Sequence, residues 1–306
     1  PRYEATILNA RIRKAYLQNK TKIISLNDVG DLTYPYESLD GDIENIKKIT
    51  EDNHEVSSLI KEAKKPLIIF GQSSLKTRSA KYIFESVKSF LKKNHKMSDE
   101  WNSLNTISEN ASTVGSFDLG LYKTVDGSNE VLKDLENHMF EIVYLLGVDN
   151  LKFEKKNEFI IYQGSHGDKG AEIADIILPG AAYTEQNGYF TNLEGKIQKA
   201  YKASFPPEEA KEDWLIINEL AETMNHRKLF NDKDELDSSL LNQINLFIEK
   251  DKSIKSSTVE NVEFKQEILK VENEDYYYSN AIARASKTML ECKTAKVNLK
   301  LTGTEG

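Results

Sequence analysis

Short apolar runs of strand length recur along the chain and alternate with segments of helical periodicity. The near-continuous runs lie at Lys22–Leu26, Pro66–Gly71, Met139–Gly147, Phe159–Gly164 and Ala174–Leu178. Runs of this kind, apolar on both faces and often followed by glycine, are typical of buried parallel strands. We therefore expect strands at all five positions.

The segments between these runs favour helices. Arg78–Asn94 places its large apolar residues at helical spacing, so we expect an amphipathic helix there. Asp42–Thr50, Glu55–Ala63 and Asp99–Ala111 are predicted as further helices, the last one capped by Ser98 or Asp99. The alternation predicts an α/β fold with an open, mostly parallel sheet covered by helices.

The composition changes after about Asn225. Residues 1–225 form the predicted α/β region, and residues 226–273 are a polar extension rich in Lys, Asp, Glu, Asn and Ser. Residues 274–295 are predicted as a docking helix, and residues 296–306 as a frayed tail. The helix would carry an apolar stripe made of Tyr278, Ile282, Ala285, Met289 and Cys292.

Charge and cysteine content narrow the function classes. The 306 residues carry a net charge of −8, which does not favour nucleic acid as a partner. No apolar run approaches the roughly 18–20 residues that span a bilayer, so membrane association is expected only through a partner. The single cysteine, Cys292, cannot form an internal disulfide or a four-cysteine cluster.

Two glycine turns that follow predicted strands are the candidate ligand sites. Gly164, Gly167 and Gly170 lie in a turn whose backbone N–H groups could hold a phosphate. Gly147 and Asp149 lie in the other, where an Asp could hold a ribose or a guanine edge. Neither turn matches the P-loop or dinucleotide spacing. The alternative is that the glycines make tight connections and that the Asp caps a turn.

Other candidates for chemistry are weaker. His166 has no nearby set of ligands at metal spacing, so we predict no metal site. Glu185 and Glu194 flank Gly188 and could be an acid/base pair, but solvated loop carboxylates fit better. We assign no catalytic residue.

Several motifs occur in an order that identifies a family. They are PRYEATILNARIRKAYLQN, DLTYPYESL, KEAKKPLIIFGQSSL, DEWNSLNTISENASTVGSFDLG, YLLGVDN, FIIYQGSHGDKGAEIADIILPGAAYTEQNGYFTNLEGKIQ, PPEEAKEDWLIINELAE and EDYYYSNAIARASKTMLECKTA. With them the chain resembles the C-terminal part of the 75 kDa iron–sulfur subunit family of respiratory complex I, the G-type subunit of bacteria. The resemblance covers most of residues 1–225 and about 274–295. It leaves residues 226–270 unmatched.

The resemblance implies a molybdopterin-oxidoreductase-like fold that in mitochondrial members holds no molybdenum cofactor. It implies that the iron–sulfur clusters lie in a cysteine-rich region upstream or in a partner subunit, and that this chain holds no cofactor. The first motif falls in the middle of the family's molybdopterin-like region. We therefore expect one half of a split subunit, or else a fragment of a longer one.

The expected role is a non-redox structural part of NADH:ubiquinone oxidoreductase. The partners implied are the cysteine-rich upstream half, the flavoprotein and other peripheral-arm subunits, on the matrix side of the mitochondrial inner membrane. One alternative is an active molybdopterin or nucleotide-binding oxidoreductase fragment whose ligands lie in a missing half. Another is a free nucleotide-binding module that uses Gly147–Asn150 and Gly164–Gly170.

Overall fold

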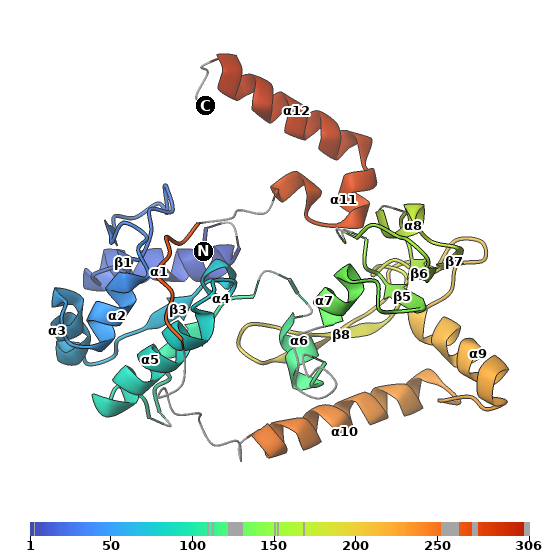
Figure 1. Ribbon diagram of the computed structural model, residues 1–306, viewed down its shortest axis with the longest axis horizontal. Helices are drawn as coiled ribbons and strands as arrows, with labels where there is room; N and C mark the ends of the chain where they lie inside the picture. Colours follow the sequence, from blue (N-terminus) through green and yellow to red (C-terminus); the bar gives the residue numbers. More distant parts are fainter. Residues whose placement is uncertain are drawn as a thin grey trace. The chain divides into compact units, whose positions relative to one another are not determined.

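A computed structural model shows two compact units (Figure 1). The first comprises Pro1–Thr113 and Ile254–Asn273, and the second comprises Val114–Ser253 and Glu274–Gly306. The structure describes residues 1–2, 4–98, 100–108, 110–111, 113–121, 131–149, 151, 153–167, 169–251, 263–270 and 275–302.

The first unit packs helices against two short parallel strand pairs. Strand β1 pairs with β2, and β3 pairs with β4. The elements of this unit are α1 (Thr6–Asn19), β1 (Ile24–Ser25), β2 (Glu37–Ser38), α2 (Glu44–Thr50), α3 (Glu55–Glu62), β3 (Ile68–Phe70), α4 (Gln72–Leu75), α5 (Ala80–Lys93) and β4 (Leu104–Thr106).

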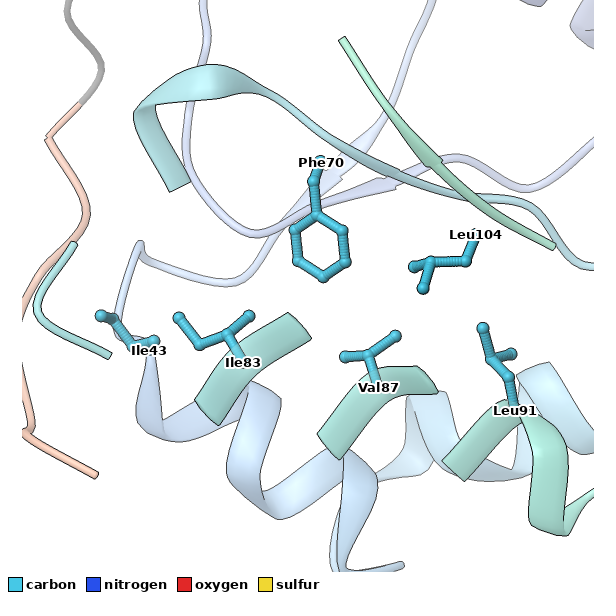
Figure 2. Packing of buried hydrophobic residues seen from close by; sticks show 6 residues of the cluster. All are labelled: Ile43, Phe70, Ile83, Val87, Leu91 and Leu104. Atoms are coloured by element: carbon cyan, nitrogen blue, oxygen red, sulfur yellow. The ribbon is translucent and has the colours of Figure 1, made fainter. Parts of the chain in front are cut away.

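The core of the first unit lies between helix α5 and the β3–β4 pair (Figure 2). The six buried residues of this cluster are Ile43, Phe70, Ile83, Val87, Leu91 and Leu104. Three of them come from α5, which confirms the amphipathic helix predicted at Arg78–Asn94. Helix α5 thus supplies half of the cluster and holds β3 and β4 over it.

Part of the polar extension belongs to this first unit. The Ser79 hydroxyl donates to the Lys265 carbonyl at 2.9 Å and accepts from the Lys265 N–H at 2.8 Å. Phe264 packs against the core cluster, and Asp42 forms an isolated antiparallel bridge with Ile268. Residues 263–270 therefore return from far along the chain to close the unit.

The helix predicted at Asp99–Ala111 is wrong. Leu104–Thr106 is instead strand β4, whose Leu104 pairs with Ile68 of β3. Trp101 bridges back to Ser98, and its indole N–H donates to the Pro66 carbonyl at 2.9 Å. Pairing with β3 overrides the weak local helical preference, because it satisfies the backbone and buries Leu104. Asp99 and Glu109 lie outside the described residues.

The second unit combines a three-stranded parallel sheet, ordered β5-β6-β7, with an antiparallel hairpin of β8 and β9. Its elements are α6 (Thr113–Asp118), α7 (Val131–Glu136), β5 (Ile142–Leu146), β6 (Phe159–Gly164), α8 (Lys169–Glu172), β7 (Ile176–Pro179), β8 (Gly188–Thr191), β9 (Ile197–Ala200), α9 (Asp213–Asn225), α10 (Lys233–Asp251), a 3₁₀ turn (Tyr276–Tyr278), α11 (Ala281–Ala285) and α12 (Lys287–Thr302).

The expected α/β class with mostly parallel strands is confirmed. Over the described residues, however, the strands form four separate small sheets. The sequence pattern also missed the β8–β9 hairpin, whose turn ends at Gly195 with a positive φ of 78°. Glycine adopts this conformation without the steric cost that a side chain would bring.

The C-terminal stripe falls on three separate elements, namely the 3₁₀ turn, the five-residue helix α11 and the 16-residue helix α12. Asn280 caps α11 by accepting the Ala283 N–H at 2.9 Å, and Ser286 is extended at a ψ of 120°. The Ser286 hydroxyl then accepts the Met289 N–H at 3.3 Å at the start of α12. These side-chain bonds to the backbone compete with a continuous helix. Among the helices of the described part of the chain, none combines the length and apolarity that a membrane crossing requires.

Candidate functional site

The candidate site lies where β5 and β6 end, as the strand pattern predicts. Gly147 follows β5 with a φ of 65°, and its N–H donates to the Gln163 carbonyl at 2.7 Å. A Cβ on Gly170 would overlap the Val148 carbonyl oxygen, so the turns after β5 and β6 lie against each other. The topology thus brings both predicted glycine turns to one edge of the sheet.

Asp149 is engaged by the chain's own C-terminal segment. Its Oδ1 lies 2.8 Å from Nη2 of Arg284 in α11, and the two side chains are only 14% and 22% exposed. Nη1 of Arg284 also donates to the Tyr278 carbonyl at 3.1 Å. The carboxylate that the sequence assigned to a ribose or to a turn cap therefore binds a guanidinium. Asn150, the last residue of that turn, lies outside the described residues.

The turn after β6 wraps around the side chain of Tyr162. The Tyr162 hydroxyl donates to the His166 carbonyl at 2.7 Å. A Cβ on Gly164 would overlap this hydroxyl, and one on Gly170 would lie 3.0 Å from two carbons of the Tyr162 ring. Gly164 and Gly170 thus permit close packing around a side chain of the protein itself.

The remaining candidates of this turn show no comparable constraint. A Cβ on Gly167 would make an ordinary 3.6 Å contact with Ala171, and Asp168 lies outside the described residues. Helix α8, which follows, has only four residues and presents a poor dipole to an anion. His166 Nδ1 lies 3.0 Å from the Ser165 hydroxyl.

The two glutamates considered as an acid/base pair lie in separate turns. Glu185 accepts the Ala182 N–H at 2.9 Å, and the Glu194 N–H donates to the Asn192 side chain at 3.0 Å. Within the described ranges, no three His, Cys, Asp or Glu side chains converge as a metal site would require.

Sequence reasoning missed a buried polar network on the other face of β6. Gln163, which is fully buried, donates to Asp213 Oδ1 at 2.8 Å and accepts from the Tyr144 hydroxyl. Gln186 donates to Asp213 Oδ2, also at 2.8 Å. Burial, and after it the charge of Asp213, raises the pKa of Tyr144. The available signal was a glutamine that interrupts the apolar run of β6.

This network ties β6 to the start of helix α9. A Cβ on Gly180 would lie 2.8 Å from Asp213 Oδ1, which explains the glycine that follows Leu178 and Pro179. Asp213 is the first residue of α9, where a carboxylate also interacts favourably with the helix dipole. The network therefore positions α9, and its groups bind one another.

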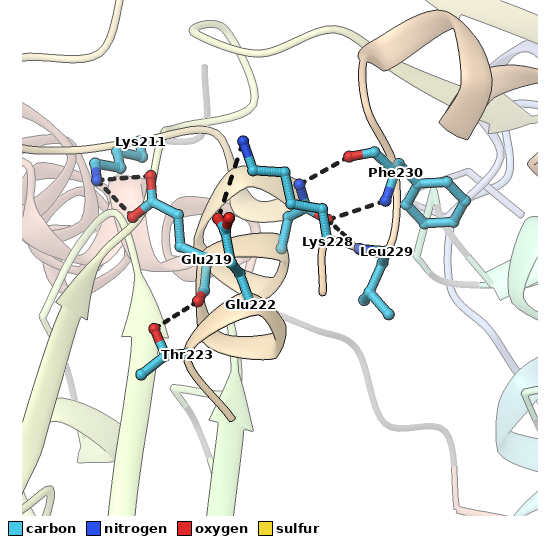
Figure 3. Close-up of polar contacts among 8 residues, drawn as sticks. Lys211, Glu219, Glu222, Thr223, Lys228, Leu229 and Phe230 are labelled. Carbon is cyan, nitrogen blue, oxygen red and sulfur yellow. Dashed lines mark hydrogen bonds and ion pairs between the residues drawn. The ribbon is translucent and has the colours of Figure 1, made fainter. Parts of the chain in front are cut away.

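Helix α9 in turn organises the segment that follows it (Figure 3). Asn218 is buried, accepts the N–H groups of Leu229 and Phe230, and donates to the Phe230 carbonyl at 2.9 Å. Ion pairs join Lys211 to Glu219 and Lys228 to Glu222 on the exposed side of the helix. Each of these contacts holds the fold together.

A second ionic cluster fastens α10 to the hairpin. Asp237 lies 2.8 Å from Lys233 and 3.0 Å from Lys199 of β9, with only 8% of its side chain exposed. Burial opposes ionisation of Asp237, but the hydrogen bonds from Lys233 and Lys199 outweigh it and hold its pKa below the usual range. The buried Asp237 carboxylate thereby holds α10, which is part of the polar extension, against the hairpin.

Comparison with known proteins places this architecture in a family. Residues 1–223 match the molybdopterin oxidoreductase model, and residues 245–292 match the model of the C-terminal region of the G-type subunits of NADH-ubiquinone oxidoreductase. A 75 kDa subunit of NADH-ubiquinone oxidoreductase from Reclinomonas americana is 36% identical over 96% of this chain. The G-type subunit of NADH-quinone oxidoreductase from Rickettsia bellii is 35% identical over 99% of it.

A mitochondrial 78 kDa subunit from Neurospora crassa is 35% identical over 97% of this chain. The chain spans 43%, 44% and 41% of these three relatives. Its family is clear from the extent of the match: the chain belongs to the molybdopterin oxidoreductase family, among relatives that are 75 kDa, 78 kDa and G-type subunits of NADH:quinone oxidoreductases.

Proposed function

We propose that this chain is a non-redox structural part of the 75 kDa subunit of NADH:ubiquinone oxidoreductase, respiratory complex I. In this role it supports the peripheral arm through which electrons pass from NADH to ubiquinone. The observation that carries the proposal is the pairing of Asp149 with Arg284 at the edge of the sheet where ligands bind in such folds. A scaffold needs this edge closed, whereas a nucleotide site needs its carboxylate available.

The molybdenum–pterin group that the family name implies does not fit the residues found here. Molybdenum sites of such folds use a Cys, selenocysteine or Ser ligand. The one cysteine, Cys292, lies exposed on α12, and the Ser165 hydroxyl in the turn after β6 lies 3.0 Å from His166 Nδ1. The turn after β6 is filled by Tyr162, and the turn after β5 is held by Arg284.

The expected partners follow from the proposed role. Iron–sulfur clusters would lie in the cysteine-rich upstream half of the subunit or in a partner, because this chain has one thiol and clusters take four. The flavoprotein and other peripheral-arm subunits would be its neighbours on the matrix side of the mitochondrial inner membrane. The relative from Neurospora crassa is a mitochondrial protein, which supports the mitochondrial part of this proposal. Contact with the membrane would be made only through the complex.

Purification through a tag on this chain tests the proposal. The recovered assembly should oxidise NADH with a ubiquinone analogue, contain a cysteine-rich chain, and hold no stoichiometric molybdenum or tungsten. About one molybdenum or tungsten per assembly would favour instead an active oxidoreductase fragment whose ligands lie elsewhere. Recovery of the chain without a quinone reductase would refute the proposal.

The nucleotide-binding alternative needs a separate measurement. Calorimetric titration of the purified assembly with GTP and NADPH, and of the isolated chain with NADH, measures binding at the two turns. A binding signal that Asp149→Asn abolishes would overturn the structural role. The pairing with Arg284 predicts no such signal.

A further inference from the structure

The three-stranded sheet of the second unit is covered unequally on its two faces. We propose that the open face of this sheet, defined by Ile142, Leu146, Phe159 and Ile176, binds an amphipathic helix from the upstream part of the same subunit. This inference rests on the proposed function and deepens it by assigning a surface to that partner.

The strand register puts the four residues on one face. Ile142 pairs with Phe159, and Leu146 lies four residues after Ile142 on the same strand. Ile176 pairs with Ile161, which is two residues after Phe159. Because side chains alternate between faces along a strand, all four point to the same side of the sheet.

These four side chains are exposed although they are large and apolar. The exposed fractions are 64% for Ile142, 47% for Leu146, 43% for Phe159 and 44% for Ile176. On the opposite face, Leu145 of β5 and Ile160 and Tyr162 of β6 are 4%, 0% and 2% exposed, whereas Ile177 on the edge strand β7 is 54% exposed. Within the described part of the second unit, side chains therefore cover β5 and β6 on the opposite face and leave these four residues exposed.

Local contacts cover part of this face at the carboxyl end of β6. Gln163 lies on this face, near the carboxyl end of β6, and is fully buried beside Asp213 at the start of α9. Toward the beginning of the strands, Ile142 and Phe159 lie side by side and are solvated. Parallel sheets are normally covered by helices on both faces, so within the described part of the second unit these side chains are exposed where a helix normally packs.

The relatives indicate where that helix comes from. The match at residues 245–292 is to a C-terminal region, and the chain spans 41% to 44% of the three relatives. The larger unmatched part of those relatives therefore precedes the region that this chain covers. A helix from that part would cover an aliphatic and aromatic face with its apolar stripe.

Cross-linking from the face itself tests the proposal in the intact assembly. Phe159→p-benzoylphenylalanine places a photoreactive group on the open face, at the start of the middle strand β6, and a matched variant, Tyr201→p-benzoylphenylalanine, places one on a residue that is 76% exposed outside it. We expect the first variant to cross-link to one helical peptide of the cysteine-rich upstream part. The second should give no cross-link to that peptide.

A measurement of how much cysteine-rich chain is recovered complements the cross-linking. Ile142→Glu should lower the amount of cysteine-rich chain recovered by about tenfold, because an unpaired carboxylate would be buried in the interface. Met224→Glu, at a residue that is 70% exposed on α9, should leave recovery unchanged. Both changes are at exposed positions, so the melting temperature of each purified variant chain should stay at that of the parent.

The outcomes separate the two proposals. Cross-links from residue 159 to another subunit, to a second copy or to this chain's own peptides overturn the assignment of the face, as does unchanged recovery with Ile142→Glu. In each of these cases a chain that still copurifies with the quinone reductase leaves the proposed function standing. A parent chain that does not copurify with it overturns both.

Discussion

The ion pair between Asp149 and Arg284 should hold α11 against the sheet, and removing it should loosen that helix. At 2.8 Å and an effective dielectric constant of about 20, the attraction is about 6 kcal/mol before desolvation. Desolvation and side-chain ordering offset most of this attraction. Exposed ion pairs retain a net stabilisation of about 0.2–1 kcal/mol, and hydrogen bonds to charged groups retain about 1.5–3 kcal/mol. With side chains only 14% and 22% exposed, we expect about 1.5 kcal/mol.

Hydrogen exchange of the α11 amides in the purified assembly measures this quantity. Arg284→Ala should increase the local opening constant by about tenfold, which corresponds to about 1.4 kcal/mol. Lys211→Ala is the matched control. The ion pair of Lys211 with Glu219 is about half exposed, so its removal should change the opening constant by less than about twofold.

A double-mutant cycle separates the ion pair from the Arg284 bond to the Tyr278 carbonyl. Once Arg284 is alanine, adding Asp149→Asn should increase the opening constant much less than it does in the parent chain. Fully additive effects, or an exchange rate for Arg284→Ala equal to that of the parent, would show that the pair does not hold α11.

Three further predictions concern stability and pH. Gly170→Ala should lower the free energy of unfolding by about 1–3 kcal/mol in chemical denaturation, because the new methyl overlaps the Val148 carbonyl, whereas Gly188→Ala, with open space around it, should have little effect. Leu91→Ala should destabilise the first unit by about 2–5 kcal/mol in the same assay, since Leu91 is fully buried in the core of Figure 2, and a loss below about 1 kcal/mol would contradict that packing. The folded pKa of Asp237 is lowered, so its ionic contribution is present above the unfolded pKa of about 3.9 and is lost as pH falls through the folded value. Proteolysis of α10 should therefore accelerate in acid below about pH 4 in the parent, and Asp237→Asn should remove that pH dependence.

Much of the fold could be predicted because its signals are local. The runs that became β3, β5, β6 and β7 are apolar on both faces, and such runs predict buried parallel strands wherever they occur. Helix α5 could be predicted equally well from the spacing of its core residues. Both signals depend only on residues close together in the chain.

Long-range pairing explains what the pattern missed. Leu104–Thr106 is a strand only because β3 offers its backbone groups and a place for Leu104. The Ser79 hydroxyl forms two hydrogen bonds with the backbone of Lys265, and nothing in the composition of the polar extension indicates this partner. Such contacts bring together segments far apart in the chain, and their free energy exceeds the small differences in local propensity.

The sequence by itself determined the family, the α/β class and the position of the two glycine turns at the ends of β5 and β6, because motifs and apolar periodicity can be read from the chain alone. Only the tertiary structure decided what occupies these turns. It placed Arg284 on Asp149 and the ring of Tyr162 inside the turn from Gly164 to Gly170. A glycine turn that holds a phosphate and one that holds a tyrosine have the same sequence requirement, a backbone free of Cβ atoms, and packing alone distinguishes them.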